Sequence, residues 1–179
     1  PVTLILIMPV LISGAGATMN QYFGLPYFVG AAIMTVLVMI SNMFGLKRLV
    51  DIIGSLGPVT IIFTIIIALF ALAKNPGGLA NASAAMSQVG ELPKATSSWW
   101  LAGILYVAYN VTGSIPFLTE MGRGAASRKE AVLGAVVGAV ALMTSGLLLN
   151  LALLSYIGDI ASLSIPNLFF ADMITPAFG

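Results

Sequence analysis

Apolar runs long enough to cross a lipid bilayer follow one another along this chain. A spanning helix needs about 20 mostly apolar residues. Only 7% of the 179 residues are charged, whereas a soluble domain carries about 25%. These features predict an all-α, polytopic transmembrane helix bundle in contact with the lipid bilayer. The expected spans, about five in number, are residues 2–19, 27–44, 49–73, 98–121 and 128–157.

The residue types present exclude several kinds of chemistry. The chain has no Cys and no His, which removes thiol chemistry, His-based metal sites and imidazole acid–base catalysis. A net charge of +1 gives no electrostatic basis for binding nucleic acid. No charged residue lies deep in a predicted span, so a buried acid–base pair is also unsupported. We therefore expect no enzymatic activity, no metal and no cofactor.

The two ends of the chain indicate a fragment. The chain begins directly before an apolar run and ends within another, which Pro166 and Pro176 interrupt. We expect an internal piece of a longer polytopic protein, whose missing helices are partners of this one. Two structures fit residues 158–179: a pair of short helices in an outer loop, or the start of a further span. A short surface helix is expected between Leu79 and Val89.

Lys and Arg counts indicate the orientation of the spans, because cytoplasmic loops are enriched in both. The loops at 45–51 and 122–130 hold five basic residues, namely Lys47, Arg48, Arg123, Arg128 and Lys129. The other two, Lys74 and Lys94, belong to the connection 74–97. The counts place the first two loops in the cytoplasm, and the segments 74–97 and 158–179 outside. The spans then run out, in, out, in and out.

The span at 98–121 carries polar and helix-disrupting residues near its middle, where a lipid-facing helix should be apolar. These residues are Tyr109, Asn110, Thr112, Gly113, Ser114 and Pro116. Pro116 has no N–H for the carbonyl of Thr112, and its ring crowds that turn. Gly113 adds backbone freedom. The pattern predicts a helix that is broken between about residues 109 and 114.

A broken helix at membrane depth is a strong sequence indication of a transporter binding site. The first half-helix would end in free carbonyls near Tyr109, and the second would begin with free N–H groups near Ser114. These ends suit a small zwitterion, or a carboxylate with a cation. The alternative is a proline-kinked structural helix whose polar side chains satisfy the kink. The residue pattern leaves both interpretations open.

Small residues in two other spans predict close contact between helices. Gly14 and Gly16 lie in a patch of the first span, and Gly134 and Gly138 form a GxxxG pair in the fifth. For the first patch a second interpretation stays open, in which the small surface makes room for a ligand beside the broken helix.

Two further signals concern helix geometry. Gly57 and Pro58 predict a kink or local unwinding in the third span, because Pro58 cannot donate to the carbonyl of Gly54. Ser127 and Glu130 predict a capping box at the start of the fifth span, with Ser127 as the N-cap.

Four segments together resemble a known family. They are GAGATMNQYFGLPYFVG at 14–30, KRLVDIIGSLGP at 47–58, GILYVAYNVTGSIPFLTEMG at 103–122 and SRKEAVLGAVVG at 127–138. They resemble the YkvI-like family of bacterial membrane proteins, which is similar to the LeuT-fold transporters of the amino acid–polyamine–organocation superfamily. The resemblance covers nearly the whole chain, and the YN…GSIPFL and SxKEAxLG elements are its most specific parts.

The resemblance implies a partial LeuT-like fold. The five spans would be the third to seventh helices of two inverted five-helix repeats, and the span at 98–121 would be the discontinuous sixth helix. In that fold the unwound part of this helix supplies substrate and ion ligands, which map here onto Tyr109, Asn110, Val111, Thr112, Gly113 and Ser114. The first and eighth helices, which complete the site in that fold, are absent from this chain.

The resemblance also assigns roles to other residues. Gly14 and Gly16 would line the same cavity as the broken helix. The candidate ion ligands on the seventh helix are Thr144, Ser145 and Asn150. Hinges would lie at Gly57, Pro58 and Pro116, and residues 158–179 would form the outer loop that caps the cavity.

Two functional hypotheses follow. The first is a piece of a secondary transporter in the inner (cytoplasmic) membrane of a bacterial-type cell, which carries a small organic solute of amino-acid type and is coupled to Na⁺ or H⁺. The second is a membrane receptor or sensor that binds a small ligand on the same scaffold and signals to partner subunits.

Overall fold

The structure, a computed structural model, describes residues 2–90 and 96–174, with the backbone alone at 2–7, 46, 47 and 49. Lys94 and residues 175–179, which belong to the predicted outer segments, lie outside this part. The described chain is all-helical, without a strand. Its helices are α1 (Val2–Phe23), α2 (Tyr27–Met43), α3 (Leu46–Lys74), α4 (Gly78–Gln88), α5 (Trp99–Gly124), α6 (Arg128–Ser155), α7 (Ile157–Ile160) and α8 (Pro166–Ile174).

Each of the five predicted spans corresponds to one helix, and the ends differ by only a few residues. Three helices are long and apolar enough to cross a bilayer: Val50–Lys74 of α3, the whole of α5 and the whole of α6. α2 is apolar but has 17 residues, and α1 begins in the part known from its backbone alone. Five membrane spans therefore stay a prediction, of which three are supported by length and composition.

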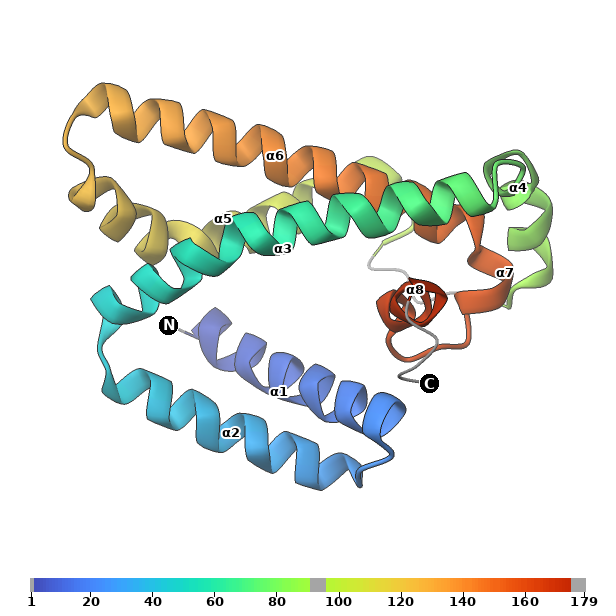
Figure 1. The fold of residues 1–179 in the computed structure, drawn as a ribbon, viewed down its shortest axis with the longest axis horizontal. Coiled ribbons are helices and arrows are strands. Elements are labelled where there is room, and N and C mark those ends of the chain that lie inside the picture. Colours follow the sequence, from blue (N-terminus) through green and yellow to red (C-terminus); the bar gives the residue numbers. More distant parts are fainter. Residues whose placement is uncertain (1, 91–95, 175–179) are drawn as a thin grey trace.

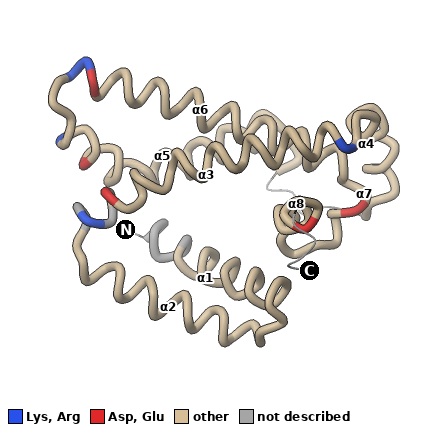
Figure 2. The backbone as a smooth tube through the Cα atoms, viewed as in Figure 1, with Lys and Arg blue, Asp and Glu red and all other residues tan. Residues whose placement is uncertain are grey.

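The long helices alternate in direction along one axis (Figure 1). α1 and α2 form an antiparallel hairpin, and α3 and α6 lie side by side and run the same way. The α2–α3 and α5–α6 connections consequently share one end of the molecule, where most of the positive residues gather in Figure 2. The opposite end holds α4, α7 and α8. This grouping agrees with the predicted alternation of the spans.

The core cluster of buried residues lies where α3 meets α6. Ala68 and Ala71 of α3 and Ala152 of α6 are buried, with exposed fractions of 1% or less. Small residues let helix backbones approach closely, so dispersion contacts are dense at this crossing. Phe170 of α8 fills the same cluster and is 1% exposed. α8 is thereby anchored to the α3–α6 pair.

Aromatic rings close this end of the molecule. Tyr156, at the C-cap of α6, lies 5.6 Å from the ring of Phe169 and 5.7 Å from that of Phe170, between centroids. Burial, with a smaller contribution from Asp159, raises the pKa of Tyr156. The Tyr156 hydroxyl donates to the carbonyl of Ala71 at 3.3 Å. Over the described residues, α7 and α8 correspond to the two short helices, one of the two structures expected after the fifth span.

α4 confirms the expected short helix, and its first residue lies against the end of α6. Asn75 Nδ2, just after α3, donates to the carbonyl of Ser155 at 2.8 Å. A Cβ added at Gly78 would collide with that same carbonyl and with the Asn75 amide. Glycine is therefore required at this position because two backbones and an amide side chain meet there.

The α1–α2 hairpin depends on a glycine pair. A Cβ at Gly30 would lie 2.8 Å from the Cβ of Met19 and 3.2 Å from the Cα of Gly16. A Cβ at Gly16 would lie 3.0 Å from the carbonyl oxygen of Tyr27. The Tyr27 hydroxyl also bonds to Ser13 Oγ at 2.7 Å. α1 and α2 thus touch where each has a glycine. This is the close helix packing that the small-residue patch predicts.

The structure bears on two predictions about other glycines and prolines. Gly134 and Gly138 have nothing within 4 Å of an added Cβ, so the GxxxG pair makes no close helix contact among the described residues. A kink or local unwinding was predicted at Gly57 and Pro58. α3 continues through both residues without interruption, so the local unwinding is wrong and the kink stays a prediction. A proline removes one backbone bond, and the remaining turns of this 29-residue helix hold it together.

The predicted capping box at the start of α6 is confirmed. The Ser127 hydroxyl accepts from the N–H of Glu130 at 3.2 Å. The Glu130 carboxylate reaches back to the N–H of Ala126 at 2.9 Å, one residue earlier than in the standard box. Two backbone donors at the start of the helix are thus satisfied by side chains.

Removing this cap is expected to have a measurable effect. Ser127→Ala should lower the free energy of unfolding by about 1 kcal/mol, because the N-cap hydroxyl is lost. The measurement is the denaturant midpoint of the helical circular-dichroism signal in detergent micelles. Ser87→Ala is the matched control, since Ser87 Oγ bonds only within α4, to the carbonyl of Ala84 at 2.6 Å. Equal midpoints for Ser127→Ala and the wild type would contradict a stabilising cap.

Candidate functional site

α5 carries the predicted site, and it is a continuous helix. It runs without interruption from Trp99 to Gly124, with Pro116 inside it. The predicted break between residues 109 and 114 is therefore wrong, and so are the half-helix ends assigned near Tyr109 and Ser114. A single proline removes one backbone donor, and the neighbouring turns preserve the helix.

The polar side chains of this stretch bond along the helix instead of replacing its backbone bonds. Asn110 Nδ2 donates to the carbonyl of Tyr106 at 2.8 Å, Thr112 Oγ1 to that of Ala108 at 2.7 Å, and Ser114 Oγ to that of Asn110 at 2.7 Å. Such bonds to the preceding turn are common for polar residues within helices. None of these three side chains reaches the carbonyl of Thr112. That carbonyl lacks its usual backbone donor, because Pro116 has no N–H. The stretch is thus a proline-containing helix with one carbonyl lacking its usual donor.

A continuous helix separates the predicted ligands onto two faces. Residues three or four apart share a helix face, whereas residues two apart do not. Asn110 therefore lies above Ser114, with Gly113 beside them, while Thr112 points to the other side with Tyr109. The six residues 109–114 could converge on one ligand only if the helix were broken. In this structure the polar side chains of the stretch that share a face are those of Asn110 and Ser114, four residues apart.

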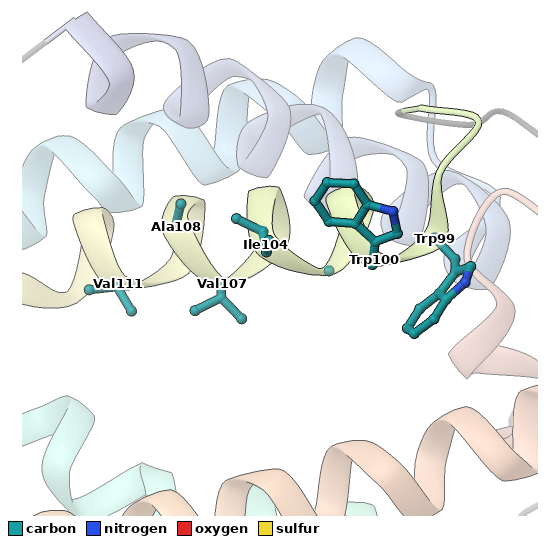
Figure 3. Close-up of a pocket in the computed structure, with 7 residues that line it drawn as sticks. Trp99, Trp100, Ile104, Val107, Ala108 and Val111 are labelled. Carbon is teal, nitrogen blue, oxygen red and sulfur yellow. The ribbon is translucent and has the colours of Figure 1, made fainter.

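α5 is also the least covered of the long helices. None of its residues is buried, and its main neighbour among the described helices is α3. A hollow of about 600 Å³ lies along one side of it, with walls that come entirely from α5 itself. Figure 3 shows the labelled lining side chains, from Trp99 to Val111, on this single helix. The lining is apolar, so Val111 belongs to an apolar surface and not to the polar pair.

The candidate ion ligands on α6 do not come together. Ser145 is buried, 4% exposed, and donates to the carbonyl of Leu142 at 2.9 Å. Asn150 is exposed and donates to the carbonyl of Gly146 at 2.9 Å, and Thr144 is exposed. The described residues also hold no group of three or more carboxylate, His or Cys side chains placed to bind a metal. Thr144, Ser145 and Asn150 thus form no common site with α5 here.

The structure separates the roles of Gly14 and Gly16. Gly16 lies in the tight contact with α2 described above, which supports helix packing at that position. Gly14 has nothing within 4 Å of an added Cβ, and its carbonyl accepts from Thr18 Oγ1 at 2.9 Å. Only Gly14 therefore leaves open space of the kind expected beside a ligand.

The polar pair on α5 has a definite chemical character. A hydroxyl has one proton to donate, and those of Thr112 and Ser114 are already used within the helix. What remains to offer a ligand on the Asn110–Ser114 face is the amide oxygen and the second amide N–H of Asn110, together with the oxygen lone pairs of Ser114. A surface rich in acceptors suits a cation or an ammonium group better than a carboxylate.

Comparison with known proteins does not place this chain in a family. No family model, curated protein or solved structure matches it. The resemblance to the YkvI-like family and to LeuT-fold transporters therefore stays a hypothesis based on the sequence motifs.

Several long-range polar contacts were not predicted from the sequence. The Gln21 side chain pairs with the backbone of Ile165, and Asn75 with that of Ser155. Each joins residues far apart in the chain, so no local pattern announces the partner. The one available signal was the residue type itself. A side-chain amide near a helix end indicates a hydrogen bond to some backbone group, but not to which one.

Proposed function

We propose that this chain is part of a secondary transporter in the inner (cytoplasmic) membrane of a bacterial-type cell. The transported species is a small organic solute of amino-acid type, and Na⁺ or H⁺ drives its uptake. In this proposal the helices α1, α2, α3, α5 and α6 are the third to seventh helices of a LeuT-like fold, completed by helices of the same polypeptide that this chain lacks. The solute binds at the Asn110–Ser114 face of an intact α5.

One observation carries the proposal: an acceptor-rich polar pair, with Asn110 exposed and Ser114 partly exposed, lies halfway along an apolar helix of 26 residues. Polar groups that face lipid at this depth are costly, so they usually face protein, water or a ligand. No other described helix covers this face of α5 closely enough to bury it. A solute or cation that approaches Asn110 and Ser114 would satisfy these acceptors.

Transport in proteoliposomes tests this assignment. In the full-length protein, Asn110→Ala should reduce uptake of radiolabelled amino acids roughly tenfold or more, the effect of losing about 1.4 kcal/mol of binding. Gly113→Leu should act similarly, because a leucine there would cover the polar pair. An added Cβ at Gly113 meets nothing within 4 Å, so the variant is expected to fold.

Matched controls lie on the same helix. Thr119 also bonds to its own helix, to the carbonyl of Ile115 at 2.8 Å, but lies outside the polar pair. Gly122 has open space like Gly113. Thr119→Ala and Gly122→Leu should therefore keep their uptake. Full uptake by both Asn110→Ala and Gly113→Leu would contradict the site. Saturable binding without any flux would support the receptor hypothesis in place of transport.

A further inference from the structure

The Gln21 side chain forms a two-bond pair with the peptide backbone of Ile165. Its Nε2 donates to the carbonyl of Ile165 at 3.4 Å, and its Oε1 accepts from the N–H of Ile165 at 3.2 Å. The primary amide thus satisfies both backbone groups of one residue, as a neighbouring strand would. The partners are 144 residues apart in the chain. This pair connects the last turn of α1 to the segment between α7 and α8.

The two sides of the pair belong to bodies that are each well held together. On one side, α1 and α2 are locked by the Gly16–Gly30 contact and by the bond from Asn20 Nδ2 to the carbonyl of Leu25, at 2.8 Å. On the other side, the α7–α8 segment is flanked by Ile160 and Phe170, which are 3% and 1% exposed. The second body is the α3–α6 pair with α7 and α8.

The two bodies are joined covalently at the opposite end of the hairpin, through Gly45 between α2 and α3 (Figure 1). Gly45 has φ +79° and ψ 160°, a conformation that is essentially limited to glycine. A glycine at a short connection allows the angle between the flanking helices to change with few atoms in the way. The hairpin thus has a flexible connection at one end and the Gln21 pair at the other.

We propose that the α1–α2 hairpin is a hinged unit, which pivots at Gly45 and is latched by the Gln21 amide on the Ile165 peptide. The latch is exposed to water, which competes for both bonds, so it opens and closes reversibly. Opening moves the hairpin as one body away from the α7–α8 segment. This proposal concerns motion within the chain and holds whether or not the chain transports a solute.

Spin-label distances measure the motion directly. The chain has no Cys, so Phe28→Cys and Asn167→Cys introduce the only two labelling sites, both at exposed positions. Electron–electron double resonance in lipid nanodiscs then reports the distance between hairpin and α8. Adding Gln21→Leu, which removes both bonds, should lengthen and broaden this distribution. Gln21→Glu keeps the acceptor for the Ile165 N–H, so its distance distribution should lie between those of the wild type and Gln21→Leu.

Hydrogen exchange gives an independent measurement on the unlabelled protein. The Ile165 amide is protected by Gln21 Oε1 and should exchange faster in Gln21→Leu. Ser41→Ala is the control, because Ser41 Oγ bonds only within α2, to the carbonyl of Leu37 at 2.7 Å. It should leave both measurements unchanged.

A hinge variant keeps the test decisive if Gln21→Leu fails to fold. Gly45→Ala should shift the spin-label distance even with Gln21 intact, because alanine disfavours φ +79°. Wild-type distances in Gln21→Leu, or in Gly45→Ala where Gln21→Leu cannot be prepared, would overturn the proposal. So would unchanged exchange of the Ile165 amide in Gln21→Glu and Gln21→Leu alike.

Discussion

Phe170→Ala is expected to lower the free energy of unfolding by about 3–5 kcal/mol, the range found when a buried aromatic side chain is removed. Phe170 is 1% exposed and packs on Ala68, Ala71 and Ala152, where α8 meets the α3–α6 pair. Those three neighbours are too small to fill the space that the ring leaves. α8 should therefore be held less firmly against the α3–α6 pair.

The measurement is the denaturant midpoint of the helical signal in detergent micelles. Phe28→Ala serves as the matched control, because the ring of Phe28 is 82% exposed. A loss of stability in Phe170→Ala no larger than in Phe28→Ala would show that α8 is not part of the packed core. Hydrogen exchange should localise the effect, with residues of α8 losing protection first.

Gly78→Ala is the second change with a large expected effect. The new methyl group would collide with the carbonyl of Ser155 and with the Asn75 amide that bonds to it. Overpacking of this kind costs about 1–3 kcal/mol, and loss of the hydrogen bond adds about 1 kcal/mol. A carbonyl in a helix end cannot move aside easily, so α4 is expected to separate from α6.

The neighbouring glycine supplies the control. An added Cβ at Gly77 would lie 3.9 Å from Asn81 Nδ2, which is ordinary contact. Gly77→Ala should therefore change the unfolding midpoint little, while Gly78→Ala lowers it. Asn75→Ala should reproduce part of the Gly78→Ala effect, since it removes the same bond to Ser155. Similar midpoints for both glycine variants would contradict the close approach of α4 to α6.

The helices themselves could be predicted from local sequence. Apolar runs of spanning length predicted all five long helices, and the Ser127–Glu130 pattern predicted the start of α6. The short helix α4 was also expected. These features depend on residues within a few turns of one another, so the local sequence is sufficient to predict them. The common end of the two basic loops follows from the same alternation of helices.

The continuity of α5 was not predictable in this way. Pro116 and Gly113 weaken a helix locally, but whether it breaks depends on what surrounds it. The side-chain bonds of Asn110, Thr112 and Ser114 are compatible with an intact helix. Local composition therefore located the polar stretch but predicted its backbone wrongly.

The sequence by itself determined that the chain forms long apolar helices, where they begin and end to within a few residues, and which stretch of them is polar. Those properties arise from hydrophobic runs and neighbouring residues. The tertiary structure decided which glycines touch another helix, as Gly16, Gly30 and Gly78 do and Gly134 and Gly138 do not. It also decided the pairing of Gln21 with Ile165. These contacts depend on how distant segments are placed in space, because the atoms that meet have no fixed relation along the chain.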